Sequence, residues 1–463
     1  MEELLIKNGY VINAHSSVRA DVLVSGSKIA AVGTKLKGST PGTKVIDATG
    51  LYVLPGAIDA HTHLEMEMMG GKTFSADSYE SGTMAAACGG TTTVFDYTLQ
   101  EKGGSILGMI KDRQALCDPQ ACVDYCFHGG ISDVNDESLE EMADTVRYGV
   151  PSFKTYMVYD FGLGDADLIR VLKRSKEVGG LITVHAENRG MIDVKVADFK
   201  KQAKLDPYHH YLSRPEECEE EADFRIMLLA KEVGAPLYIV HLANAGGVEL
   251  YRRMRAGGYP IFAETCPQYL NFTSDVYKRD DAVKFICSPP IKGKKSQAAL
   301  WEAIKDGQIT TIATDHCPSQ LYEKEWGKDD FTKAPNGCMG IENMYPYMLS
   351  EANQGKITFQ RAVELCSTNV AKVFGLAPKK GMIQPGSDAD IVLYDPKKEF
   401  TVTKKNMHSN VDYTIWEGTK LKGYPVMTMV RGTVVYKDGK FVGKPGFGEF
   451  VKRKPLHFKN NVL

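Results

Sequence analysis

The sequence lacks the features that mark membrane-spanning, disulfide-rich and secreted proteins. No run of 18 apolar residues occurs in the 463 residues, so no segment is predicted to span a bilayer. The ten cysteines include no repeated CxxC pairs, which favours free thiols in a reducing compartment. The start, MEELLIKNGY, has acidic residues where a secretory signal carries basic ones. We therefore expect a cytoplasmic protein.

The sequence also has almost no excess of charge. Its formal net charge is −2, which provides no electrostatic attraction to nucleic acid or to an anionic membrane. An apolar content of 43% and a charged content of 25% are typical of a soluble globular protein. A chain of 463 residues is too long for one ordinary core, so one large and one smaller domain are expected. The partner is expected to be a small-molecule substrate.

The middle of the chain alternates short apolar runs with longer helix-like stretches, which predicts βα units around a parallel sheet. The predicted strands are PGAIDAH (55–61), TTTVFDY (91–97), VDYCFHG (123–129), SFKTYM (152–157), LITVHAE (181–187), PLYIVHL (236–242), YPIFAET (259–265) and ITTIATDH (309–316). Eight strands in this length favour a (β/α)₈ TIM-like barrel, with a doubly wound sheet as the alternative. Longer intervals at 188–220 and 267–305 are predicted insertions on the active face.

Both ends of the chain are rich in strand patterns with turn signals. Asn8-Gly9 and Ser25-Gly26-Ser27 mark hairpin turns near the start, and Arg431-Gly432 and Asp438-Gly439 mark turns near the end. We expect one small β-sandwich built from residues 1–55 and 386–445, around a catalytic barrel at 56–385. The basic tail, 446–463, is predicted to be either a disordered end or a contact with a neighbouring subunit.

Six potential metal ligands follow or end predicted strands at five separate places. They are His61 and His63 in an HTH pair, Lys154, His185, His241 and Asp315. In a barrel the functional groups lie at the C-terminal ends of the strands, so these side chains are expected to meet. Because side chains alternate faces along a strand, the two histidines of the pair point the same way and can hold one cation. Imidazole nitrogen suits zinc and its neighbours, so the set predicts a metallohydrolase.

Lys154 is the unusual member of this set, because an ammonium group repels metal cations. On its own strand it reads as a lysine that reaches solvent or pairs with an acid. The other five ligands favour a second interpretation, in which the neutral amine reacts with CO₂ and forms a carbamate. Burial and nearby positive charge lower the pKa of a lysine and favour that neutral amine. Such a carboxylate on a long arm can bridge two cations.

Six motifs resemble the cyclic amidohydrolases, specifically the dihydropyrimidinases and D-hydantoinases. They are PGAIDAHTHLE, FKTYMVY, TVHAEN, IVHLAN, ATDHCP and GMIQPGSDADIVLYD, and the resemblance runs from about residue 3 to 445. It implies two Zn²⁺ ions per chain, bridged by N6-carboxylated Lys154. One ion would be held by His61, His63 and Asp315, and the other by His185 and His241. The resemblance also implies a homotetramer.

The same resemblance implies roles in hydrolysis of a cyclic amide. Water activated between the two cations would attack a ring carbonyl, with Asp315 as the base that passes the proton to the leaving nitrogen. Tyr159 matches the tyrosine that stabilises the oxyanion. Ser288 and Asn336 match positions that hold the imide part of the ring, although both also fit ordinary turns. The products would be N-carbamoyl amino acids.

The residues after the HTH pair bear on the choice of ring. Dihydroorotases carry an arginine there that holds a substrate carboxylate, whereas this chain has Leu64-Glu65-Met66; allantoinases carry a more polar stretch. The apolar residues near this stretch predict either an apolar lip on the site or, equally, ordinary loop packing. They are Leu64, Met66, Met68, Met69, Phe74 and Phe161. The lip suits an uncharged dihydropyrimidine or a 5-substituted hydantoin. The alternatives are an allantoinase, a non-catalytic scaffold like the collapsin response mediator proteins, and a single-metal deaminase.

Overall fold

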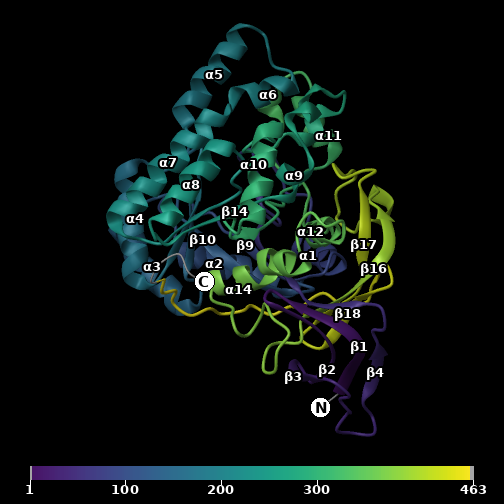
Figure 1. The fold of residues 1–463 in the computed structure, drawn as a ribbon. Coiled ribbons are helices and arrows are strands. Elements are labelled where there is room, and N and C mark those ends of the chain that lie inside the picture. The colour runs from purple at the N-terminus through teal and green to yellow at the C-terminus, as the bar shows by residue number, and fades with distance from the viewer. Residues whose placement is uncertain (1–2, 459–463) are drawn as a thin grey trace.

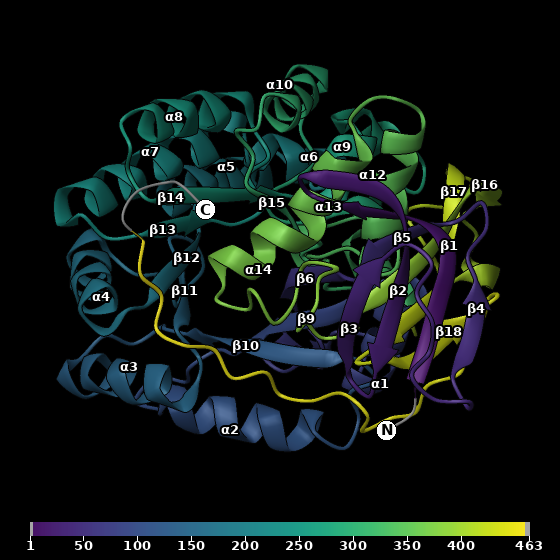
Figure 2. The same ribbon diagram turned by 60° about the horizontal axis from the view of Figure 1, so that its bottom comes forward.

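The computed structural model describes residues 3–458, which form a parallel barrel joined to a second, larger sheet. The barrel lies within a ring of helices, and the second sheet stands beside it (Figures 1 and 2). The predicted architecture of a TIM-like barrel with a β domain built from both chain ends is confirmed.

The barrel sheet contains eight parallel strands in the order β15-β14-β13-β12-β11-β10-β9-β6. Their bounds are β6 Ala57–Thr62, β9 Thr91–Tyr97, β10 Asp124–Gly130, β11 Ser152–Tyr156, β12 Leu181–His185, β13 Leu237–Ile239, β14 Ile261–Thr265 and β15 Thr311–Ile312. Every residue of these strands is buried, as expected for a parallel sheet covered on both faces. All eight overlap the predicted strands, although β13 and β15 are shorter than predicted because the chain bends into the site.

The barrel closes between its first and last strands. His316, just after β15, lies beside Thr62 in a parallel bridge, and the His63 amide donates to the His316 carbonyl at 2.9 Å. One layer lower, the Thr314 amide donates to the Asp59 carboxylate at 3.1 Å. This closure excludes the doubly wound sheet.

Helices cover the outside of the barrel and its C-terminal face. Their bounds are α1 Tyr79–Cys88, α2 Ile106–Cys117, α3 Asp136–Tyr148, α4 Asp165–Val178, α5 Arg189–Lys201, α6 Pro207–Ser213, α7 Glu216–Val233, α8 Ala245–Ala256, α9 Pro267–Asn271, α10 Lys294–Lys305, α11 Leu321–Lys324, α12 Met344–Asn353, α13 Phe359–Val363 and α14 Asn369–Val373. Short 3₁₀ segments are η1 Ser274–Lys278, η2 Ala282–Phe285, η3 Glu325–Gly327, η4 Phe331–Lys333 and η6 Lys404–Asn406, and η5 Glu364–Thr368 is a π turn. Within residues 3–458 no helix combines the length and apolar character needed to cross a bilayer.

Two of these helices end at a glycine. Gly179 and Gly234 follow α4 and α7 with φ of 72° and 66°, the left-handed conformation that glycine adopts without a steric penalty. The predicted insertions carry α5, α6, α9 and η1, and α5 and α6 stand above the barrel in Figure 1.

The second sheet has nine strands, contributed by both ends of the chain. They are β1 Glu3–Asn13, β2 Ser16–Ser25, β3 Lys28–Gly33, β4 Lys44–Asp47, β5 Tyr52–Pro55, β16 Ile391–Thr401, β17 Lys420–Val430, β18 Thr433–Lys437 and β19 Lys440–Phe441; a separate hairpin pairs β7 Glu67–Met68 with β8 Thr73–Phe74. Antiparallel pairing of β16 with β5 joins the two ends. Their shared core is made of apolar residues such as Val22, Val53, Ile391 and Met429.

One predicted hairpin turn is wrong. Asn8-Gly9 lies inside β1 as a bulge, not at a chain reversal, and Asn8 has φ of 64° while its amide donates to Asp21 at 2.9 Å. Asparagine followed by glycine fits a bulge as well as a turn, because both need left-handed backbone. The turns predicted at Gly26, Gly432 and Gly439 are present, each with positive φ.

The C-terminal segment packs on its own barrel. The Tyr125 amide donates to the Glu449 carbonyl, and the Val451 and Leu456 amides donate to carbonyls of Tyr125 and Gly179. In Figure 2 this segment runs along the barrel from β10 toward β13. Thus, as far as residue 458, the tail is ordered, which corrects the expectation of a disordered end.

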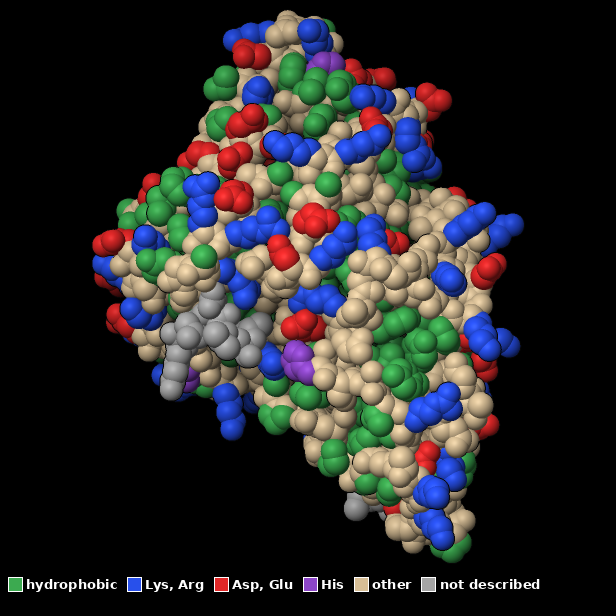
Figure 3. Space-filling model, viewed as in Figure 1, with side chains coloured by type: hydrophobic (Ala, Val, Ile, Leu, Met, Phe, Trp, Pro, Cys, Tyr) green, Lys and Arg blue, Asp and Glu red, His purple; other side chains and the backbone are tan. Residues whose placement is uncertain are grey.

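Charged side chains of both signs are mixed over the surface. On the face shown in Figure 3, Lys and Arg side chains alternate with Asp and Glu over the helical part of the molecule. This face therefore has no large patch of one charge sign, in agreement with the net charge of −2.

Candidate metal centre and active site

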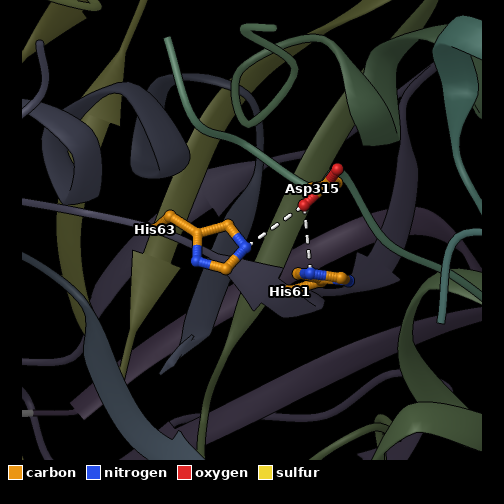
Figure 4. Close-up of side chains that lie close together, drawn as sticks. All are labelled: His61, His63 and Asp315. Carbon is orange, nitrogen blue, oxygen red and sulfur yellow. Dashed lines mark ion pairs between the residues drawn. The ribbon is translucent and has the colours of Figure 1, made fainter. Parts of the chain in front are cut away.

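Three of the predicted ligands converge at the junction between the first and last barrel strands. His61 and His63 come from β6 and its end, and Asp315 follows β15. The Asp315 Oδ1 atom lies 3.0 Å from Nε2 of His61 and 3.2 Å from Nε2 of His63. Figure 4 shows both rings turned toward this carboxylate. Two nitrogens and one oxygen within 4.8 Å of one another form a donor set that suits zinc.

The other two predicted histidines meet beside this group. Nε2 of His241 lies 3.0 Å from Nδ1 of His185, and the rings of His241 and His61 are 5.5 Å apart. The Nε2 atom of His185 lies 2.8 Å from Glu187, so its Nδ1 atom is the one that faces His241. The two sets of ligands are therefore neighbours at one end of the barrel.

Lys154 reaches the same place from β11. Its side chain is 1% exposed, and its Nζ atom lies over the rings of Tyr97 and Tyr156, 4.7 and 5.2 Å from their centroids. Burial lowers the pKa of Lys154 to about 8, although the charges of Asp315 and Glu264 oppose the shift. This amine is thus far easier to deprotonate than an exposed lysine, as carbamate formation requires.

Burial favours the neutral, metal-binding form of three of the four predicted ligand histidines. Burial lowers the pKa of His63, His185 and His241. His61 differs: burial opposes its protonation, but the charges of Glu264 and Asp315 outweigh burial and raise its pKa. The Nδ1 atoms of His63 and His241 are buried and have no hydrogen-bond partner among the described residues. Such orphaned nitrogens fit a site built for cations.

Three predicted site residues have strained backbone conformations. Tyr159, His241 and Asp315 have φ of 72°, 40° and 52°, a region that non-glycine residues rarely adopt. Strain of this kind costs on the order of 1–3 kcal/mol per residue and persists where the surrounding structure imposes it, often at functional sites. In all three cases the left-handed residue lies shortly after a barrel strand, where the chain leaves the strand direction.

Comparison with known proteins identifies the family. The family model of the amidohydrolases matches residues 52–435. D-phenylhydantoinase from Escherichia coli O1:K1 is 41% identical over 457 residues, which cover 98% of each chain. The chain belongs to the amidohydrolase family, in its dihydropyrimidinase and D-hydantoinase branch.

Solved structures support the assignment of this chain to the amidohydrolase family. Dihydropyrimidinase from Brevibacillus agri NCHU1002 superposes with a TM-score of 0.96 at 40% identity, covering 98% of this chain and 100% of that one. L-hydantoinase from Arthrobacter aurescens superposes with a TM-score of 0.89 at 31% identity, with the same coverage. The predicted resemblance is confirmed, and the protein is an enzyme of the cyclic amidohydrolase type.

The residues that the resemblance assigned to substrate binding also lie together in this amidohydrolase. The Ser288 hydroxyl donates to the Asn336 side chain at 3.3 Å, and it also hydrogen-bonds to Tyr159. Tyr159 follows β11 and its ring lies 5.4 Å from that of His185. Burial raises the pKa of Tyr159, so its hydroxyl keeps its proton and can donate a hydrogen bond.

The predicted apolar lip of the amidohydrolase divides into two sets. Leu64 and Met68 are buried, and Leu64 packs against Gly82 of α1, where an added Cβ would lie 2.4 Å away. Phe74 and Phe161 are 56% and 36% exposed, and Phe161 contacts the rings of Tyr156 and Tyr159. The first set therefore serves packing and the second is open to solvent, whereas Met66 and Met69 are half-buried.

The sequence analysis missed two carboxylates that orient the histidines of this amidohydrolase. Glu264, on β14, contacts Nδ1 of His61 and accepts hydrogen bonds from Tyr238 and the His241 amide. Glu187 contacts His185 and Arg214. Such partners fix which ring nitrogen faces a metal. Glu187 could have been found from its place two residues after a predicted ligand histidine, whereas Glu264 lies inside a strand with no such signal.

Proposed function

We propose that this amidohydrolase hydrolyses the ring amide of 5,6-dihydropyrimidines (dihydrouracil, dihydrothymine), of 5-substituted hydantoins, or of both, giving N-carbamoyl amino acids. The observation that carries the proposal is the meeting of His61, His63, Lys154, His185, His241 and Asp315 at one end of the barrel. Relatives named D-phenylhydantoinase and dihydropyrimidinase, matching over 98% of the chain, support the ring chemistry.

The residues present fit two zinc ions. His61, His63 and Asp315 would hold one and His185 and His241 the other, with a carbamate on Lys154 shared between them. The donors are nitrogen and carboxylate oxygen, which suit zinc and also manganese or cobalt. When bound, such ions supply Lewis acidity and activate water at neutral pH.

The side chains of the enzyme would transfer the proton, stabilise the oxyanion and hold the ring. Asp315 accepts the proton of the attacking water and delivers it to the ring nitrogen as the C–N bond breaks. Tyr159 donates its hydroxyl hydrogen to the carbonyl oxygen, on which negative charge develops. Ser288 and Asn336 hold the imide part of the ring, so the carbonyl carbon is presented to the water in one orientation.

The rim of the site favours an uncharged ring. Leu64, Glu65 and Met66 follow the HTH pair, with no arginine to pair with a substrate carboxylate. The exposed rings of Phe74 and Phe161 suit an apolar exocyclic group. An allantoinase remains the second candidate, and a non-catalytic scaffold would not need every proposed ligand in place.

A rate comparison with a metal count tests the proposal. The zinc-loaded protein is expected to open dihydrouracil, dihydrothymine, hydantoin or phenylhydantoin, and to lose that activity with a strong chelator. Zinc should be present at two ions per chain in the active site, and allantoin should be opened slowly or not at all. A protein that holds zinc but opens none of the four rings would contradict the assignment.

Two further proposals concern the assembly and the location of the enzyme. We infer a homotetramer, as the resemblance to this branch implies, and a cytoplasmic location, which the free cysteines favour. Light scattering of the purified protein gives its mass directly, and a monomer of 51.1 kDa would contradict the tetramer.

A further inference from the structure

Three clusters of potential metal ligands occur in residues 3–458, each with its ligand atoms within 4.8 Å of one another. The first is the candidate metal centre described above. The second contains Asp124, Asp388 and Asp390, but the Lys380 ammonium lies among them, 2.7, 3.2 and 2.6 Å from their carboxylates. The Lys380 ammonium therefore occupies the place that a metal ion would take, and Lys28 and Arg431 contact Asp388 and Asp124. The third cluster has no role in the chemistry proposed so far.

The third cluster contains one sulfur, one oxygen and one nitrogen donor. Cys88 is the last residue of α1, Glu342 lies just before α12, and His408 lies between η6 and β17. The Nδ1 atom of His408 lies 2.6 Å from Oε1 of Glu342, and its backbone amide donates to Oε2 at 2.7 Å. The side chain of Cys88 is fully buried, whereas that of His408 is 26% exposed and opens a path from solvent.

We propose that Cys88, Glu342 and His408 bind a borderline-soft divalent cation such as zinc, at a site separate from the catalytic centre. The charges balance when the cation is bound: a thiolate and a carboxylate neutralise the two positive charges, and the imidazole is neutral. Such a neutral complex avoids the large cost of burying an isolated charge. A thiolate together with imidazole and carboxylate is a ligand set that zinc accepts.

The ion-free arrangement resembles that of the candidate catalytic centre. There, histidine nitrogens face the Asp315 carboxylate at 3.0 and 3.2 Å; here, the His408 nitrogen faces Glu342. In the acidic cluster a lysine occupies the place of a metal ion. The partner of Glu342 is instead His408, which can lose its proton and then bind a metal ion. Binding would release the thiol proton of Cys88 and any proton on His408.

Burial keeps the thiol protonated when no cation is present. It raises the pKa of Cys88 far above its ordinary value, and the charge of Glu342 adds to the shift. A buried thiol of this kind is inert as a nucleophile, so a redox or catalytic role for Cys88 is not favoured. A metal ion supplies the positive charge that makes the thiolate stable.

The position of the site indicates a structural role. Cys88 belongs to a helix that packs on the barrel, while His408 belongs to the connection between β16 and β17 of the second sheet. The backbone of Gly89 lies so close to Glu342 that an added Cβ would be 2.4 Å from its carbonyl oxygen. The cation would therefore tie α1 and the segment before α12, whose backbones already touch, to the connection between β16 and β17.

Cobalt substitution tests the site without relying on catalysis. The ligands proposed for the catalytic centre contain no sulfur, so a thiolate-to-cobalt charge-transfer absorption in the near ultraviolet reports a cysteine ligand. The metal-free protein titrated with Co²⁺ is expected to show this absorption and to bind one cobalt more than the catalytic centre holds. Cys88→Ser should lose both the absorption and that one equivalent.

Two further variants make the result decisive. His408→Gln should also lose the absorption, and because this side chain is partly exposed, its fold is expected to survive if Cys88→Ser misfolds. Cys366→Ser, which alters another fully buried cysteine, is the matched control and should keep the absorption. Wild-type protein with no absorption at saturating Co²⁺, or absorption that persists in His408→Gln or in a folded Cys88→Ser, would overturn the proposal.

Discussion

The Nε2 atom of His185 lies 2.8 Å from a carboxylate oxygen of Glu187, and Arg214 donates to the same oxygen at 2.5 Å. This contact fixes the ring so that its Nδ1 atom faces His241. Burial would raise the pKa of Glu187, but the charge of Arg214 and the hydrogen bond from His185 outweigh it and lower the pKa to about 2. Glu187 is therefore a carboxylate that orients one proposed ligand.

Glu187→Gln is expected to lower zinc affinity at the proposed centre and kcat/KM for ring opening by about 10–100-fold. The amide keeps the shape of the side chain but loses the charge that holds the His185 ring. Zinc titration against a competing chelator measures the effect together with the rate. Glu217→Gln, on the exposed face of α7, is the control, and equal losses in both variants would argue against this role.

Lys154→Ala is expected to lower ring opening by about 1000-fold or more, because losing the shared ligand removes several kcal/mol of stabilisation. Zinc occupancy should fall with the rate. A short carboxylic acid added to the solution is expected to restore part of both, since it can replace the carbamate. Lys173→Ala, on the exposed side of α4, should behave as wild type; full activity and full zinc in the Lys154 variant would refute the bridging role.

Acid stability is expected to depend on Asp77. Burial opposes ionisation of this carboxyl, but hydrogen bonds from His316, Asn410 and Ser409 and the charge of His316 lower its pKa to about 2. The ordinary value is 3.8, so the ionised form contributes about 2 kcal/mol of stability above pH 4. That contribution is lost as the pH falls from about 4 toward 2.

The difference in thermal midpoint between wild type and Asp77→Asn should therefore be largest above pH 4 and shrink below it. Scanning calorimetry from pH 7 to pH 3 measures the difference. Asp160→Asn, at a side chain that is 97% exposed, should show little difference at any pH. A difference for Asp77→Asn that stays constant over this range would contradict the linkage.

The buried Lys380 cluster is expected to contribute strongly to stability, because it joins a barrel strand to the second sheet. Lys380→Met leaves Asp390 buried without a cation, whereas Asp124 and Asp388 keep only their contacts with Arg431 and Lys28. Breaking a buried ion pair in this way typically costs about 3–5 kcal/mol. Denaturant unfolding of this variant, beside the exposed neighbour Lys379→Met, measures the effect; similar stability in the two would disprove it.

A chain that ends at Gly443 is expected to unfold at a lower temperature but to keep its subunit count. Val451 and Leu456 are 2% and 7% exposed on the barrel, and burial of each such side chain contributes about 1.5–3 kcal/mol. Differential scanning calorimetry and light scattering measure the two properties. Loss of oligomerisation without a change in thermal midpoint would instead assign the tail to a neighbouring subunit.

Most of the barrel could be predicted from the sequence because its strands are short runs rich in β-branched and apolar residues, separated by longer helix-like stretches. The TTTVFDY run coincides with β9, from Thr91 to Tyr97. The turn at Asn8-Gly9 failed because a bulge and a hairpin demand the same backbone conformation, and only pairing with Asp21 and β2 decides between them.

In the candidate site too, some residues could be predicted from the sequence and others only from tertiary contacts. Residue type and position at strand ends were enough to select His61 and Asp315, since the fold brings strand ends together. Glu264 was missed because a carboxylate inside an apolar strand has no periodic pattern to mark it, and its purpose is visible only where it meets His61. The left-handed backbone of His241 and Asp315 also has no glycine to signal it in the sequence.

Because the barrel is joined where β6 meets the segment after β15, His61 and Asp315 come from opposite ends of the catalytic part of the polypeptide. During synthesis, the first of these residues leaves the ribosome long before the second. A nascent chain therefore cannot assemble this trio of side chains until its last barrel strand has emerged. A cation held by all three side chains would therefore bind only after the barrel has closed.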